Sequence, residues 1–275
     1  MRIFREKNVD HIKHAIDCVN GVNLNGVNYK IRLSSNEPLF ELFSKVSVEN
    51  KEVLAVLSSG DHYFYADKFG AKSVDAFDIN PLTYYYSKLR EYWMCIYHQF
   101  YFDAKTINNE DSFKYFLNQV KELNSEDSEE FEEVCKFWYG YISQVSPEKR
   151  VELFYESYMS SQMDSYAQQY SLPKKMIFFE QDLAGKLIID KEYDVVFPSN
   201  IIEGYALDQD GLIAIRNNLS QLLKKDGMIV CSCCCGNATE NALELGNFNE
   251  LFECSSLYSL QIPQKKIGYQ LSKRC

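Results

Sequence analysis

Two short polar segments in the first half of the chain have residue types that suit a nucleoside. Ser58-Ser59-Gly60-Asp61 comes directly after the apolar run 53–57, and Asp78-Ile79-Asn80 ends the next run. Small residues let a turn approach a ligand closely, and a carboxylate can accept hydrogen bonds from both hydroxyls of a ribose. We therefore predict a nucleoside site, with the first segment at the charged end of the ligand and Asp78 at its ribose.

The glycines of the first segment indicate which nucleoside is bound. Dinucleotide folds use G-x-G-x-x-G to approach a pyrophosphate, whereas this turn contains only Gly60. A sulfonium nucleoside carries no phosphate and needs only a small, tight turn. The turn disfavours NAD and favours S-adenosylmethionine. An alternative role for Asp78 is to cap the helix that Asn80-Pro81 starts.

Two later segments are candidates for the rest of the site. Asp182-Leu183 follows a third apolar run, where a carboxylate can accept a hydrogen bond from an exocyclic amine; an ordinary loop acid is the alternative. Ser199-Asn200 follows a fourth run, at the sheet edge where open α/β folds bind ligands. Glu203 and Tyr205 are candidates for a catalytic base and a ring contact, or else they start a helix.

The pattern of apolar runs and helices predicts an α/β fold with a mostly parallel sheet. Strands expected to be buried on both faces have continuous apolar runs. The last two runs, joined by a proline-containing turn, indicate an antiparallel hairpin at the sheet edge. We predict a Rossmann-like, seven-stranded sheet that ends in this hairpin. The expected strands are 53–57, 73–79, 176–179, 193–197, 228–232, 256–262 and 267–272, with helices at 62–69, 81–97, 212–223 and 242–252.

The chain divides into three predicted parts. Residues 1–50 have helical periodicity and form an N-terminal cover. Residues 51–101 and 171–275 form the domain that binds S-adenosylmethionine. Residues 102–170 form a helical insertion, which is long for a crossover and is therefore expected to be functional. We predict that it serves as a lid over the acceptor pocket.

The order of these motifs, with YDVVFPSNIIEGY and LLKKDGMIVCS near the end, resembles the class I S-adenosylmethionine-dependent methyltransferases. Local motifs resemble the betaine-lipid synthase family of 3-amino-3-carboxypropyl transferases. These motifs are Ser58-Ser59-Gly60, Asp78-Ile79-Asn80-Pro81, Lys88 and Ser199-Asn200-Ile201.

The resemblance implies a role for each matching segment. Ser58, Ser59 and Gly60 would hold the methionine end and Asp78 the ribose. Asp182 with Leu183 would hold the adenine, and Ser199 with Asn200 would form the reacting face. The chain departs from the methyltransferase pattern at Ala55, where an acid is usual, and in its single glycine.

We expect a cytoplasmic S-adenosylmethionine-dependent methyltransferase that acts on a small molecule. Displacement at a sulfonium methyl group depends mainly on alignment, so few catalytic side chains need be recognisable. The alternatives are a 3-amino-3-carboxypropyl transferase and a cofactor-binding relative without activity. Ala55 and the single glycine motivate the last of these.

Composition excludes several partners and locations. The net charge of -10 disfavours nucleic acid, and no apolar stretch is long enough for a membrane span. Nine cysteines without a regular framework, behind a charged N-terminus, indicate reduced thiols in a cytoplasm. The oligomeric state and the acceptor are not predicted.

No metal site is predicted. His11 and His14 lie one helical turn apart, and a solvated helix face is favoured over a metal. Cys231, Cys233, Cys234 and Cys235 resemble a zinc motif. Alternate residues of a strand, however, lie about 6.5 Å apart, whereas zinc needs sulfurs about 4 Å from one another. Core thiols are the preferred interpretation.

Overall fold

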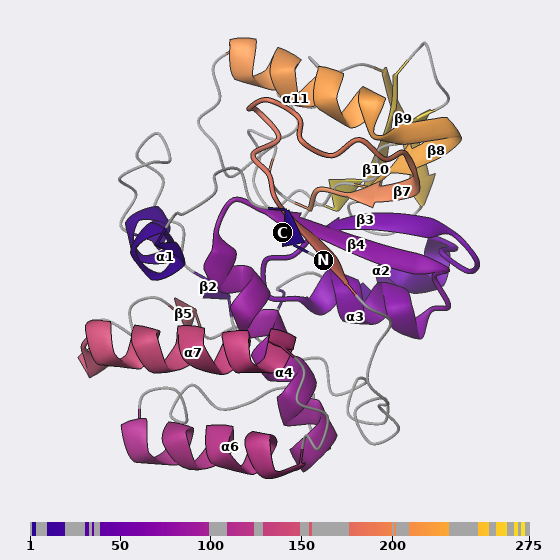
Figure 1. The fold of residues 1–275 in the computed structure, drawn as a ribbon. Helices are drawn as coiled ribbons and strands as arrows, with labels where there is room; N and C mark the ends of the chain where they lie inside the picture. The colour runs from indigo at the N-terminus through magenta and orange to yellow at the C-terminus, as the bar shows by residue number, and fades with distance from the viewer. Residues whose placement is uncertain are drawn as a thin grey trace.

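A parallel sheet organises the described part of this computed structural model (Figure 1). Five main strands and the two-residue β1 are hydrogen-bonded side by side. In spatial order they are β1 (Arg2–Ile3), β6 (Ile177–Glu180), β4 (Ser73–Asp78), β3 (Glu52–Val56), β7 (Tyr193–Phe197) and β8 (Leu223–Ile229). The structure describes residues 2–3, 10–19, 31–32, 35, 39–98, 109–123, 129–148, 154–155, 176–199, 201, 209–230, 247–252, 257–262, 267–268 and 271–272.

The strand order reverses direction at β3. From β3 the chain proceeds outward through β4 to β6, and it then returns to the other side of β3 as β7 and β8. The boundary between β3 and β7 is therefore a topological switch point, where the loops at the carboxyl ends of the strands diverge and leave room for a ligand. The predicted Rossmann-like α/β character is confirmed in this general form.

The predicted seven-stranded sheet with an edge hairpin is wrong. The closing strands form a separate antiparallel sheet, in which β10 (Leu257–Ile262) pairs with β9 (Asn247–Phe252), β11 (Ile267–Gly268) and β12 (Leu271–Ser272). The expected helix over 242–252 ends in strand β9 instead.

An irregular edge accounts for this difference. The register between β7 and β8 shifts after Tyr193, and Asp226 in β8 has φ 67°. Such a bulge disrupts the ladder and discourages further pairing at an edge. The strand predicted at 228–232 accordingly begins earlier, at Leu223. At the opposite edge, β1 adds to β6, and its two residues were too few for periodicity to reveal.

Helices cover both faces of the sheet. Helix α11 (Gln209–Gln221) packs on one face, with Ile215 and Leu219 in the core there. Helices α2 (Leu39–Lys45), α3 (Asp61–Lys68) and α4 (Pro81–Tyr97) pack on the other. Helix α1 (His11–Val19) lies beside the latter group. Helices α1 and α2 both belong to the N-terminal segment, whose role as a cover stays a prediction.

Helix α4 is the central helix of the molecule and is buried along most of its length. Asn80 caps it, since its Oδ1 accepts a hydrogen bond from the Leu82 amide at 2.9 Å, and Pro81 occupies the first turn. Tyr84, Tyr85 and Tyr86 are all buried in the core.

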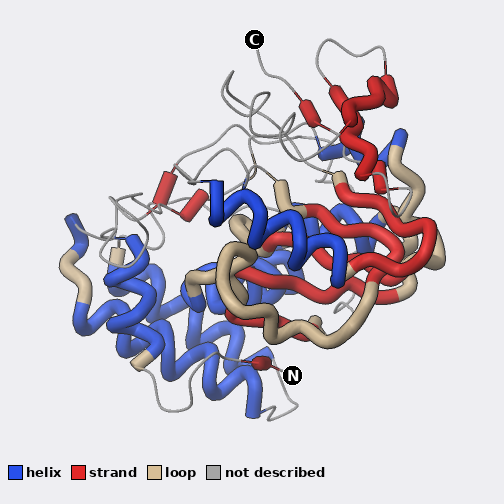
Figure 2. Tube along the Cα trace, turned by 90° about the horizontal axis from the view of Figure 1, so that it is seen from above, coloured by secondary structure: helices blue, strands red, loops and turns tan. Residues whose placement is uncertain are grey.

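The predicted insertion begins with two helices that pack on α4. Helix α7 (Glu129–Gln144) stacks Phe137 on Tyr85, with ring centroids 3.7 Å apart. Helix α6 (Glu110–Leu123) places Phe116 against Trp93, near the last turn of α4. Figure 2 shows this helix-rich part beside the sheet.

The insertion also joins the N-terminal segment. Gly140 of α7 lies against Ile12 of α1, because a Cβ at Gly140 would come within 2.5 Å of the Ile12 Cδ1. Strand β2 (Ile31–Arg32) pairs in parallel with β5 (Phe154–Tyr155). Helix α6 lies at the end of α4 remote from the carboxyl edge of the sheet. The lid stays a prediction for the whole insertion, residues 102–170, much of which lies outside the described residues.

A buried charge cluster fastens α7 to α4. The Lys88 Nζ lies 3.0 Å from Glu91 Oε2 and 3.4 Å from Glu130 Oε2, and the Tyr84 hydroxyl donates to Glu130 at 2.8 Å. Burial alone would lower the pKa of Lys88, but Glu91 and Glu130 outweigh it and raise that pKa. Burial raises the pKa of Glu91, and Lys88 offsets only part of this rise.

We expect Lys88→Met to lower the free energy of unfolding by about 3–5 kcal/mol at pH 7, because the Glu91 charge stays buried without its cation. The double variant Lys88→Met/Glu91→Leu should recover most of this loss, as urea denaturation would measure. The destabilisation of Lys88→Met should shrink as the pH falls through the raised pKa of Glu91, since the folded state then binds a proton that the unfolded state still lacks. Equal stability of the single and double variants would contradict this account.

Candidate functional site

The turn after β3 is held by the end of β4. The Ser58 amide donates to Asp78 Oδ2 at 2.9 Å, and Ser58 and Gly60 have positive φ angles of 45° and 88°. A serine in the left-handed region costs conformational energy, and such residues concentrate at functional sites. The two polar segments that the sequence indicated are therefore in direct contact.

A buried arginine holds the same turn from α4. The side chain of Arg90 is fully buried, and its Nη2 lies 2.7 Å from Asp61 Oδ1 while its Nη1 donates to the Ser59 carbonyl. The guanidinium also lies over the Phe64 ring, 5.1 Å from its centroid. Sequence reasoning missed Arg90, because a single arginine within a helix carries no spacing signal.

Asp61 supports the turn from within. Its Oδ2 accepts hydrogen bonds from the Ser59 hydroxyl, at 3.1 Å, and from the Ser35 amide, while its Oδ1 faces Arg90. Asp61 was predicted to bind the cofactor. These contacts hold the turn in shape and tie it to the N-terminal segment, and the cofactor role of Asp61 stays a prediction.

Gly60 is required for a close approach to α4. A Cβ built at Gly60 would lie 2.6 Å from the Ser87 hydroxyl oxygen. The Ser87 hydroxyl is buried and has no hydrogen-bond partner among the described residues. The one glycine of the motif therefore serves the contact between the turn and the helix.

Asp78 links three parts of the site. Its Oδ1 accepts from the Asn80 amide at 3.0 Å and its Oδ2 from Ser58, and its main-chain carbonyl accepts from the Gln181 amide at 2.9 Å. Asp78 therefore fulfils part of its alternative role as a helix cap, since it accepts a hydrogen bond from an amide at the start of α4. The ribose role stays a prediction.

Two buried polar atoms beside Asp78 lack a partner among the described residues. They are Nδ2 of Asn80, which is fully buried, and Oε2 of Glu180. Glu180 ends β6 and is paired in register with Asp78, so the two side chains project to the same face of the sheet. A buried donor and a buried acceptor without partners are groups that a polar ligand could satisfy.

His14 of helix α1 contacts Glu180, since its Nε2 lies 3.3 Å from Glu180 Oε1. The expected solvated face of α1 is thus wrong for His14, whose imidazole is only 24% exposed. Glu180 was not predicted as a site residue, because Asp182 was chosen as the acid that follows the third apolar run.

The contacts of Asp182 and Leu183 belong to their own turn and to the core. Asp182 Oδ1 accepts from the Ala184 amide at 2.9 Å. The Leu183 side chain is buried in the core beside α11, and its carbonyl accepts from Asn218 Nδ2 at 2.7 Å. The hydrogen bond from Ala184 supports the alternative that Asp182 is an ordinary loop acid. The adenine role stays a prediction.

Ser199 follows β7 on the other side of the switch point. It is buried and has φ 54°, so the two strands that flank the switch point each continue into a serine in the left-handed region, Ser58 and Ser199. Ile79 is half-buried beside Asp78. Asn200, Glu203 and Tyr205 lie outside the described residues.

The described residues also bear on metals, thiols and membranes. Among them, no three His, Cys, Asp or Glu side chains are grouped so that they could hold a metal ion. Burial raises the pKa of the Cys95 and Cys135 thiols to about 11. The four clustered cysteines at 231–235 lie outside the described residues. No helix in the described ranges has the length and apolar character needed to cross a bilayer.

The chain matches no model of a known protein family and no curated protein sequence. Its function must therefore be inferred from its own residues.

We expect Gly60→Ala to destabilise the protein more than Gly70→Ala. Both glycines have positive φ, 88° and 82°, so both substitutions cost about 1–2 kcal/mol of backbone energy. At Gly70 a Cβ would meet nothing closer than Glu49 Cγ at 3.6 Å, whereas at Gly60 it would overlap the Ser87 hydroxyl. Overpacking should add about 1–3 kcal/mol at Gly60, as urea denaturation would measure. Equal losses would show that the turn does not press on α4.

Proposed function

We propose that this protein is an S-adenosylmethionine-dependent methyltransferase that acts on a small molecule. The observation that carries the proposal is the Asp78 carboxylate, which ends β4 and contacts the small-residue turn of β3 beside the switch point of a parallel sheet. Open α/β sheets bind ligands at this place. The single-glycine turn suits a nucleoside without phosphates.

The residues present fit such a ligand. Ser58 to Gly60 would face its methionine end, and Asp78 would accept from the ribose hydroxyls. The unpaired Asn80 Nδ2 would donate to the ligand and the unpaired Glu180 Oε2 would accept from it. Asp182 and Leu183 would contribute to the adenine end.

When bound, S-adenosylmethionine supplies an electrophilic methyl group on a sulfonium. The protein has to align an acceptor with that group, which can provide most of the rate enhancement for a displacement of this kind. Ser199, together with Asn200, Glu203 and Tyr205, follows β7 and would form the side of the site at which the acceptor enters.

A 3-amino-3-carboxypropyl transferase is the second candidate, on the four motifs that resemble the betaine-lipid synthases. One of these motif residues, Lys88, lies in the buried cluster with Glu91 and Glu130. It therefore favours neither reaction. A cofactor-binding relative without activity is the third candidate.

We expect isothermal titration calorimetry to detect binding of S-adenosylhomocysteine by the wild type, and Asp78→Asn to weaken it about tenfold or more. The amide removes the charge and one acceptor oxygen from the ribose contact, and losing a hydrogen bond to a charged group costs about 1.5–3 kcal/mol. The matched control is Asp75→Asn. Asp75 is a buried carboxylate of the same strand that binds Lys191 and Tyr193.

Asp75→Asn should lower stability and leave the affinity unchanged. Failure of the wild type to bind, or equal binding by a folded Asp78→Asn variant, would overturn the proposal.

Analysis of the spent cofactor separates the candidate reactions. After incubation with a panel of amine, thiol and phenol acceptors, chromatography should show S-adenosylhomocysteine, because the bond from sulfur to the methyl group is broken. Methylthioadenosine would instead identify 3-amino-3-carboxypropyl transfer. Binding without either product would favour the relative without activity.

A further inference from the structure

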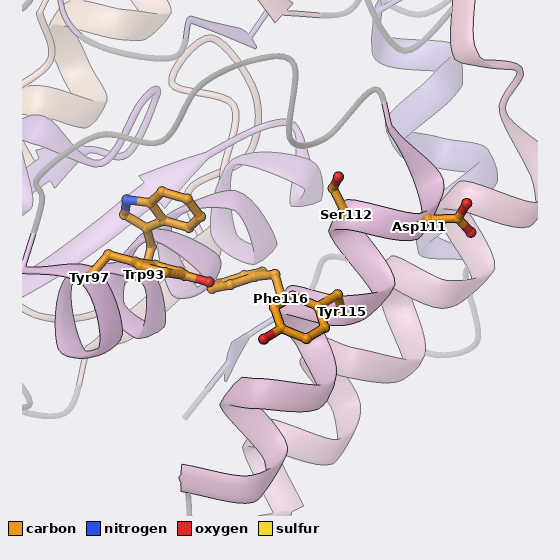
Figure 3. A pocket seen from close by; sticks show the side chains of 6 residues that line it. All are labelled: Trp93, Tyr97, Asp111, Ser112, Tyr115 and Phe116. Atoms are coloured by element: carbon orange, nitrogen blue, oxygen red, sulfur yellow. The ribbon is translucent and has the colours of Figure 1, made fainter.

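A groove lies between the last turns of α4 and the first turns of α6, and Figure 3 shows the side chains that line it. Its volume is about 430 Å³, within the range of small-molecule sites. Helix α4 has 17 residues and is therefore about 25 Å long. Asn80 caps its other end, so the groove is separate from the site around Asp78.

Aromatic side chains form most of the groove. Trp93 and Phe116 lie deepest, with ring centroids 5.2 Å apart and little exposed surface. Tyr97 lies against Trp93, with centroids 4.3 Å apart, and Tyr115 is 62% exposed. Two of the rings that reach the surface are therefore tyrosines, whose faces are electron-rich.

A glutamine bridges the two tyrosines. The Tyr97 hydroxyl donates to Gln119 Oε1 at 2.6 Å, and Gln119 Nε2 donates to the Tyr115 hydroxyl at 2.9 Å. Both rings are thus held in place before any ligand binds, which reduces the entropy cost of binding.

The Asp111 carboxylate lies at the edge of the groove, near enough to Lys114 for a weak electrostatic attraction. Asp111 lines it together with Ser112, and no contact of Asp111 with a cation within 4 Å is found in the described part of the chain. Lys114, one turn further along α6, is bonded to Glu110 at 2.6 Å instead. Aromatic faces and a carboxylate both attract cations, and the net charge of the chain is -10.

We propose that this groove binds a small organic cation with an apolar body, such as a methylated ammonium. The tyrosine faces and Trp93 would contact the methyl groups, while Asp111 would compensate the charge. A simple metal ion would gain little from rings, and a neutral apolar molecule would gain nothing from Asp111.

The test uses the full-length protein and two probes of nearly equal shape, choline and its neutral analogue 3,3-dimethyl-1-butanol. The chain contains two tryptophans, each with its own indole N–H resonance in a proton–nitrogen correlation spectrum. Trp138 is buried and donates to the Tyr85 carbonyl at 3.1 Å, so it serves as an internal control. Choline should shift the Trp93 resonance saturably and leave that of Trp138 in place, whereas the alcohol should bind more weakly.

Asp111→Asn should weaken choline about two- to fivefold and leave the alcohol unchanged, since an exposed charge pair contributes little more than this. Asp210→Asn is the matched control, because Asp210 is also an exposed aspartate at the second position of a helix. It should leave the affinity for choline unchanged. The proposal is overturned if the Trp93 resonance does not shift saturably, if the alcohol binds as tightly as choline, or if Asp210→Asn weakens choline as much as Asp111→Asn.

Discussion

The buried contact of Arg90 with the turn after β3 is the constraint on which the candidate site depends. A guanidinium without access to water requires partners, and here it has the Asp61 carboxylate and the Ser59 carbonyl. Because Arg90 is fixed on α4, the turn has to follow the position of that helix. Asp78 fixes the same turn from the other side. A small-residue turn that would otherwise be mobile is thereby held in one shape before a ligand arrives.

The two ends of the sheet differ in chemistry. At the amino ends of the strands, charged side chains pair with one another, since Lys191 binds Asp75 and Lys224 binds Glu52 and Asp194, while the Ser73 hydroxyl is buried without a described partner. At the carboxyl ends, Asn80 and Glu180 keep buried polar atoms without described partners. An unpaired buried polar atom costs about 1–3 kcal/mol. At Asn80 and Glu180 this cost is explained if the carboxyl edge receives a polar ligand.

The sequence predicted the centre of the fold better than its edges. The core segments of strands β3, β4 and β7 are mostly apolar, and Asn80-Pro81 is a strong start for a helix, so each was found at nearly its observed position. The bulge of β8 and the short strand β1 depend on tertiary pairing, which periodicity does not contain. Asp78 and Ser58 could be predicted because their strands are adjacent in sequence and in space. Arg90, Glu180 and His14 could not, since only folding brings their helices and strands to the turn.

A crystal structure of the protein with S-adenosylhomocysteine tests the central claim most directly. The account predicts the ribose hydroxyls on the Asp78 carboxylate, the amino-acid end against the turn of Ser58 to Gly60, and a ligand group within hydrogen-bond distance of Glu180 Oε2 or Asn80 Nδ2. A ligand bound elsewhere on the molecule, with the atoms of Asn80 and Glu180 still unpaired, would contradict it.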